Sequence, residues 1–222
     1  MQQAAVDIRD LADKIVGAIP RFDSVSRQVA MRLYRLLAEG KPVPIERLAN
    51  TLDLSSETVS GVLSRYPAFY DDQGAVIGFG GLTVVEMPPH FFRVEGQTLY
   101  TWCAWDSLFI PGILGKTAEV TSRDPITHTP ISLTVAPGGV KHVRPESTVV
   151  SFLTPDRTFD RNVIENFCHF VHFFGSHEAG RAWTAQHAGT FLLSVDDAFA
   201  LGHLANTRHY GEAFITPSED RD

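Results

Sequence analysis

The first 80 residues alternate apolar stretches of helical spacing with polar turns. After Asp23, apolar residues recur three and four positions apart, which predicts a helix with one buried face. A short helix over residues 45–52 is followed by a second helix that Ser55 can cap, a pairing typical of a helix-turn-helix motif. Residues 69–77 predict two short strands around a polar glycine turn, which would supply a wing. We therefore expect residues 1–80 to form a winged-helix-like domain.

Beyond residue 81 the apolar runs shorten, and proline or glycine separates most of them. Strand-like segments lie at 82–85, 91–94, 97–101, 117–121, 131–135, 149–152, 169–174 and 191–195. A helical pattern begins near Cys103 and ends by Gly112 or Gly115, and others cover 160–167, 177–187 and 196–210. The chain is thus expected to be α+β, with a mixed, largely antiparallel sheet domain over residues 81–215 flanked by helices. The polar segment 216–222 is expected to be a flexible tail.

Composition and charge indicate a globular protein and argue against some kinds of binding partner. The chain has 222 residues, of which 44% are hydrophobic and 20% charged, as in a soluble globular protein. Its net charge of −7 argues against nucleic acid or a membrane surface as a partner. No apolar run approaches the roughly 20 residues that span a bilayer, and acidic residues occupy the N-terminus where a signal peptide needs a basic start. We therefore expect a cytoplasmic protein.

Two cysteines, Cys103 and Cys168, are the only thiols in the sequence. Two are too few for a disulfide framework, so both are expected to be free in a reducing compartment. If a helix begins near Cys103, then Asp106, three residues on, projects from the same face. A thiol in a first helical turn would have a lowered pKa, because the positive end of the helix dipole stabilises the thiolate.

The state of Asp106 is open at this point. The helix dipole would keep the carboxyl group ionised, whereas the neighbouring aromatic residues Trp102, Trp105 and Phe109 would raise its pKa by desolvation. Two thiolates would bind a soft ion such as mercury, and an adjacent acid would transfer a proton. In the simpler interpretation, both cysteines are small buried apolar residues and Asp106 stabilises a helix.

Three segments, residues 99–111, 131–137 and 166–174, together resemble bacterial organomercurial (alkylmercury) lyases, and the resemblance extends over roughly residues 28–210. In that family two cysteines and an aspartate form the active site, and they match Cys103, Cys168 and Asp106. The resemblance implies an N-terminal winged-helix-like domain and a catalytic domain with a mixed sheet. It also implies cleavage of a carbon–mercury bond, with the mercuric ion passed to a mercuric reductase.

The resemblance carries two departures and several expectations. Some members have a further cysteine where this chain has Asp124, and some have paired cysteines where it has Cys168 and His169; the active-site trio is intact. We expect mercury to be substrate and product, no cofactor to be required, and free thiols to deliver the substrate and remove the product. An apolar pocket for the organic group is expected from Trp102, Trp105, Phe109, Phe167 and Phe170.

Three other interpretations compete. The helix-turn-helix pattern raises a thiol-based metal-sensing DNA-binding regulator, although residues 1–80 hold nine Lys and Arg against ten Asp and Glu and so lack net positive charge. Cys168, His169 and His172 resemble a fragment of a zinc or copper site, but Cys103 has no nearby His or Cys in the sequence to complete it. A cysteine hydrolase based on Cys103 lacks a recognised nucleophile motif.

Overall fold

A computed structural model describes residues 6–211 and residue 214 of the chain, and the tail predicted for residues 216–222 lies outside this part. The N-terminal region contains α1 (Ile8–Ala18), α2 (Ser24–Leu37), α3 (Ile45–Asn50) and α4 (Ser56–Leu63). Asp23 caps α2 by accepting a hydrogen bond from the Ser26 amide at 2.7 Å, and Ser55 caps α4 by accepting one from the Thr58 amide at 3.1 Å. The predicted helix-turn-helix is therefore present as α3 and α4.

The wing joins a larger sheet. Strands β1 (Ala68–Tyr70) and β2 (Val76–Phe79) pair antiparallel, as predicted. They continue into an eight-stranded antiparallel sheet of order β1-β2-β3-β5-β4-β6-β7-β8. Its other strands are β3 (Leu82–Thr83), β4 (Phe91–Val94), β5 (Gln97–Thr101), β6 (Ala118–Arg123), β7 (Pro130–Ala136) and β8 (Gly139–Arg144). Strands from both sides of residues 80 and 81 thus belong to one sheet. The predicted boundary between two domains at these residues stays a prediction.

The edge strand β8 was not predicted from the sequence. It follows the Pro137 to Gly139 break, and none of its residues is fully buried. An exposed edge strand has no apolar face to alternate with a polar one, so its sequence carries no period-two signal. Its position is set instead by antiparallel pairing with β7.

A second, three-stranded antiparallel sheet has the order β10-β9-β11, from β9 (Val149–Leu153), β10 (Phe173–Phe174) and β11 (Thr190–Ser194). The helices of this region are α6 (Val163–Asn166), α7 (His177–Thr184) and α8 (Val195–Tyr210), of which α7 and α8 pack against the sheet. The expectation of strand over residues 169–174 was largely wrong, because Cys168–Phe170 form a 3₁₀ turn and only Phe173–Phe174 pair in the sheet. The mixed α+β class with a largely antiparallel sheet is confirmed.

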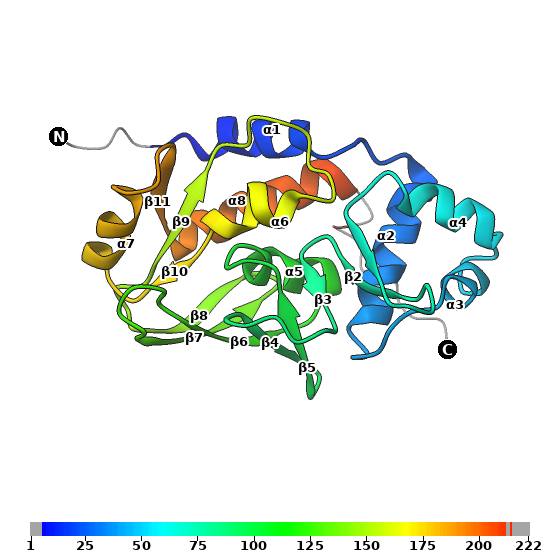
Figure 1. Ribbon diagram of the computed structural model, residues 1–222, viewed down its shortest axis with the longest axis horizontal. Coiled ribbons are helices and arrows are strands. Elements are labelled where there is room, and N and C mark those ends of the chain that lie inside the picture. The colour runs from blue at the N-terminus through cyan, green and yellow to red at the C-terminus, as the bar shows by residue number, and fades with distance from the viewer. Residues whose placement is uncertain (1–5, 212–213, 215–222) are drawn as a thin grey trace.

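At the centre of the molecule lies α5 (Asp106–Leu114), between the large sheet and α8 (Figure 1). Helix α8 packs against α5 on one side and α1 on the other, while α2 also contacts α5. One continuous apolar core runs from α1 through both sheets to α8. Consequently the segments that carry Cys103, Asp106 and Cys168 are surrounded by structure from both ends of the chain. Within the described residues, no helix is long and apolar enough to cross a membrane.

Candidate active site

Cys103 lies in the turn between β5 and α5. The turn is fixed by hydrogen bonds from the Thr101 hydroxyl to the Cys103 carbonyl at 3.0 Å and from the Ser107 hydroxyl to the Ala104 carbonyl at 2.7 Å. Helix α5 begins only at Asp106, so the expectation of a helix starting near Cys103 was wrong by one turn. Activation of this thiol from within a first helical turn therefore does not apply.

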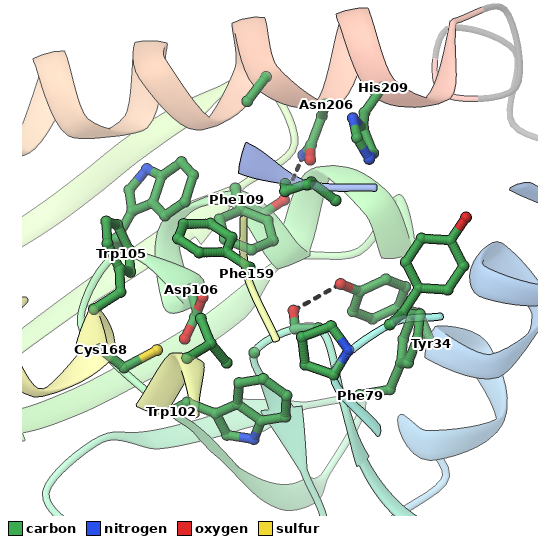
Figure 2. A pocket seen from close by; sticks show the side chains of 18 of the residues that line it. Tyr34, Phe79, Trp102, Trp105, Asp106, Phe109, Phe159, Cys168, Asn206 and His209 are labelled. Atoms are coloured by element: carbon green, nitrogen blue, oxygen red, sulfur yellow. Dashed lines mark hydrogen bonds between the residues drawn. The ribbon is translucent and has the colours of Figure 1, made fainter. Parts of the chain in front are cut away.

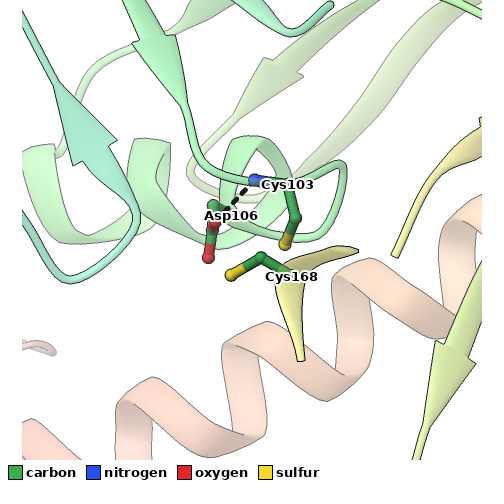
Figure 3. Close-up of side chains that lie close together, drawn as sticks. All are labelled: Cys103, Asp106 and Cys168. Carbon is green, nitrogen blue, oxygen red and sulfur yellow. Dashed lines mark hydrogen bonds between the residues drawn. The ribbon is translucent and has the colours of Figure 1, made fainter. Parts of the chain in front are cut away.

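Cys168 opens the 3₁₀ turn that follows α6. The amide of Ala104 donates to the carbonyl of Val171 at 3.1 Å, which ties the loop after the first cysteine to the turn of the second. As a result, the ligand atoms of Cys103, Asp106 and Cys168 all lie within 4.8 Å of one another (Figure 3). All three side chains are buried, with exposed fractions of 0%, 6% and 4%. The structure thus brings together the three residues that the sequence singled out, across 65 residues of chain.

Asp106 is the first residue of α5, and its side chain turns back along the chain. One carboxylate oxygen, Oδ2, accepts a hydrogen bond from the Cys103 amide at 2.9 Å, and the side chain extends toward Cys168 (Figure 3). This bond fixes the carboxyl group beside both sulfur atoms. A proton on either thiol is therefore within reach of a carboxylate.

Burial controls the protonation of the trio. Burial, with further contributions from Cys168 and Asp106, raises the pKa of Cys103 well above its ordinary value. For Cys168 the hydrogen bond with Cys103 lowers the pKa, but burial and the Asp106 carboxyl outweigh it, so the pKa is raised. Burial also raises the pKa of Asp106 to about 7, against hydrogen bonds with Cys103 that lower it. Desolvation thus prevails at Asp106, and near neutral pH it can both accept and give up a proton.

Next to the trio is an apolar cavity of about 100 Å³ (Figure 2). Cys168 and Asp106 line it, whereas Cys103, with no exposed surface, is not part of its wall. Of the five aromatic residues predicted to form the pocket, four do so: Trp102, Trp105, Phe109 and Phe167. Phe170 does not, because it packs against a separate small core around Trp183. The prediction of an apolar pocket beside the thiols is therefore confirmed for four of its five aromatic residues and wrong for Phe170.

The sequence did not reveal the part of the wall that comes from the N-terminal region. Tyr34 of α2, Tyr66 after α4, and Gly80 and Gly81 between β2 and β3 all line the cavity, as does Tyr210 of α8. Their one visible signal was the Gly80-Gly81 pair at the end of an apolar strand, which marks a tight turn. The wing and α2 thus complete the site rather than lying apart from it.

Asp124 and His169, where some relatives were expected to carry cysteine, have different surroundings. Asp124 is buried and accepts hydrogen bonds from the amides of Ile126, Thr127 and Gly175 at 2.8–2.9 Å. Burial raises its pKa, but these amide donors prevail, so the pKa is lowered overall. His169 is exposed, and its carbonyl oxygen lies 2.7 Å from the His172 ring. Asp124 therefore holds a turn together through its backbone partners.

Among the described residues, Cys103, Asp106 and Cys168 are the group of three ligating side chains close enough to hold one ion. A zinc or copper site built on Cys168, His169 and His172 is not formed there. The partners of the Cys103 thiol are Cys168 and Asp106, so the geometry of a cysteine–histidine hydrolase is also missing from this part of the chain.

The sequence was compared with protein families and with individual known proteins, and both comparisons give the same family. Residues 85–206 match the family described as alkylmercury lyase, and residues 5–80 match the helix-turn-helix domain of alkylmercury lyase. The chain is 49% identical to an alkylmercury lyase of Pseudomonas putida over 173 residues, which cover 78% of this chain and 80% of that protein. It is 41% identical to an alkylmercury lyase of Staphylococcus epidermidis over 210 residues, 94% of this chain and 93% of that one.

A solved structure, the mercury-bound form of MerB2, superposes with a TM-score of 0.72 over 94% of this chain and 98% of its own, and at 21% identity it supports the fold. The metal-sensing regulator finds no support, because the helix-turn-helix region matches a domain of the lyases themselves. Two family matches that together span most of the sequence, and relatives above 40% identity along most of their length, establish that this chain belongs to the alkylmercury lyase family.

Proposed function

We propose that this protein cleaves the carbon–mercury bond of organomercurials by protonolysis, releasing a hydrocarbon and Hg(II). The observation that carries the proposal is the buried trio, in which two thiols and one carboxyl group lie within 4.8 Å of one another. Thiolates are the softest ligands that a protein offers, and mercury is a very soft ion. The carboxyl group adds what a purely sequestering site would not need, a proton donor at the bound metal.

The first step is an exchange of thiols. The substrate arrives as R–Hg–SR′, the adduct of an organomercurial with a small cellular thiol. One active-site cysteine forms a bond to mercury, and its proton leaves with the displaced thiol R′SH. Both cysteines have a raised pKa and begin protonated, and the displaced thiolate takes up the proton that the bound cysteine loses, so this exchange needs no external base.

Asp106 acts in the second step. The remaining cysteine gives its proton to the Asp106 carboxylate and binds mercury as a thiolate. Two thiolates increase the electron density on the metal, so the carbon–mercury bond breaks with its electron pair on carbon. Carbon takes the proton from Asp106, which gives R–H, regenerates the carboxylate and leaves Hg(II) on both sulfur atoms. A pKa of about 7 suits a group that must accept and then donate one proton.

Turnover requires removal of the product. Two thiol molecules R′SH reprotonate the cysteines and carry the metal away as Hg(SR′)₂, so the sum is R–Hg–SR′ plus R′SH giving R–H and Hg(SR′)₂. No cofactor takes part in this scheme. A mercuric reductase is the natural acceptor of the ion, and the supply of reduced thiols favours a cytoplasmic location.

The cavity accommodates the organic group. Its wall is almost wholly aromatic and apolar, and its volume of about 100 Å³ is of the same order as the engineered cavity of about 150 Å³ that binds benzene. We expect short alkyl and simple aryl groups to be substrates. The test is anaerobic incubation with phenylmercury and excess small thiol, with benzene followed by gas chromatography. More benzene than enzyme, lost in Cys168→Ser, supports the proposal; phenylmercury bound one-to-one without benzene overturns it.

A further inference from the structure

The turn between β2 and β3 approaches the Asp106 carboxyl group more closely than a side chain would permit. Gly80 and Gly81 form a two-residue hairpin, with Phe79 paired to Leu82 and with φ of +52° and +98°. A Cβ atom at position 81 would lie 2.5 Å from both Cγ and Oδ1 of Asp106. No real side chain sits at that distance, so a residue larger than glycine would displace the carboxyl group or the turn.

Both carbonyl groups of this turn are held in place. The Tyr34 hydroxyl of α2 donates to the Gly80 carbonyl at 2.7 Å (Figure 2), and the amide of Trp102 donates to the Gly81 carbonyl at 2.9 Å. Trp102 directly precedes Cys103, whose amide binds the other oxygen of Asp106. The carboxyl group is thus confined between the Cys103 amide on one side and the Gly81 backbone on the other.

We propose that Gly81 is a positioning residue for Asp106, and that its missing side chain allows the turn to hold the carboxyl group beside Cys103 and Cys168. The inference rests on the proposed protonolysis, in which this carboxyl group receives a proton from sulfur and gives it to carbon. Tyr34 acts through the same turn, since its hydroxyl fixes the Gly80 carbonyl. The N-terminal region thereby contributes to the chemistry through the position of the Asp106 carboxyl group.

The chain contains a matched control for the substitution Gly81→Ala. Gly96 is also the second residue of a two-residue hairpin, between Val94 and Gln97, with φ of +80° and nothing within 4 Å of a Cβ placed there. Gly96→Ala likewise places alanine at a positive φ in a two-residue hairpin, +80° against +98° at Gly81, with open space around its Cβ. A difference in rate between the two variants is therefore due to the contact of the new methyl group with Asp106 and not to strain in the turn.

The experiment measures mercuric-ion binding and single-turnover benzene release separately. We expect Gly81→Ala to bind one Hg(II) per chain, as wild type does, and to release benzene slower by on the order of 10²-fold, the effect of a misplaced catalytic group. Gly96→Ala should keep both properties. Equal rates in the two variants would overturn the inference, and so would loss of mercury binding together with rate in Gly81→Ala.

Two further measurements cover the ways in which this comparison can fail. If Gly81→Ala does not fold, Tyr34→Phe, which removes only the hydroxyl, should bind mercury normally and slow benzene release; an unchanged rate would overturn the inference.

The Asp106 carboxyl can also be titrated by ¹³C NMR without substrate, with Asp106→Asn identifying its signal. A titration altered in Gly81→Ala and not in Gly96→Ala supports the inference. Absence of benzene from wild type would overturn the proposed function, whereas an unaltered titration would overturn the role of Gly81.

Discussion

Replacing Asp106 with asparagine removes the proposed proton carrier with little change of shape. The asparagine oxygen can still accept the hydrogen bond from the Cys103 amide, so the turn that holds the first cysteine should persist. Mercury binding by the two sulfur atoms should therefore survive. Proton transfer by a positioned side chain contributes about 10² to 10⁴-fold to a rate, so we expect single-turnover benzene release to fall by that factor, or about 3 to 5 kcal/mol in the barrier.

Asp106→Asn should slow the reaction but raise the stability of the folded protein near neutral pH. Asp106 is buried, and its pKa rises from 3.8 in the unfolded chain to about 7 in the folded protein. Between these values the folded state binds more protons than the unfolded state, so stability is greatest below about pH 4 for this group and falls as the pH rises toward 7. The rise corresponds to about 4 kcal/mol. Asparagine does not ionise, so the variant should unfold at a higher denaturant concentration than wild type at pH 8, with a smaller difference at pH 5.

Asp124→Asn provides the control, because Asp124 is also a buried carboxylate that accepts backbone hydrogen bonds. It should lower stability by roughly 1–3 kcal/mol, the cost of one buried amide left without its acceptor, and leave the single-turnover rate unchanged. The assay is urea unfolding at pH 5 and pH 8 beside rapid-quench release of benzene. An Asp106→Asn variant that releases benzene at the wild-type rate, or that is less stable than wild type at pH 8, would refute the reasoning.

Three further predictions concern the same site. Cys103→Ser and Cys168→Ser should each abolish turnover and weaken Hg(II) retention against competing thiol, because one thiolate remains; equilibrium dialysis checks this, and retention equal to wild type would contradict it. The value of kcat/KM should rise with pH through about 7, as Asp106 becomes the carboxylate that accepts the thiol proton, and a profile flat from pH 6 to 8 would count against that role. Phe159 lines the cavity, so Phe159→Ala should raise the rate with 1-naphthylmercury relative to phenylmercury, as measured by hydrocarbon release; an unchanged ratio would place the organic group elsewhere.

The sequence predicted the elements of the fold where apolar periodicity was strong. Strands β4 and β5 were expected at the bounds that the structure has, the helical spacing after Asp23 matches α2, and Ser55 caps α4 as predicted. Strand β8 was missed because an exposed edge strand has no buried face. Aromatic residues over 169–174 favour a strand, but residues 168–170 form a 3₁₀ turn and only Phe173–Phe174 pair in the sheet.

The residues of the candidate site were expected from the sequence and lie together in the structure, whereas their protonation could not be predicted from the sequence. Nothing in a separation of 65 residues indicates that two thiols meet; the resemblance to the lyases supplied that expectation, and the bond between Ala104 and Val171 shows how the two segments are joined. The pKa directions of Cys103 and Asp106 depend on burial by distant parts of the chain, which local helix arguments omit. The closeness of Gly81 to Asp106 likewise follows from tertiary structure alone.

The central claim is that a proton from the protein's thiols reaches the carbon of the substrate. The most direct test is to equilibrate the reduced protein in D₂O, add phenylmercury with excess thiol, and analyse the benzene by mass spectrometry against the mercury released. The account predicts monodeuterated benzene, in excess over enzyme and equal to the Hg(II) transferred to thiol. Phenylmercury recovered intact on the cysteines, or benzene that carries no deuterium, would contradict it.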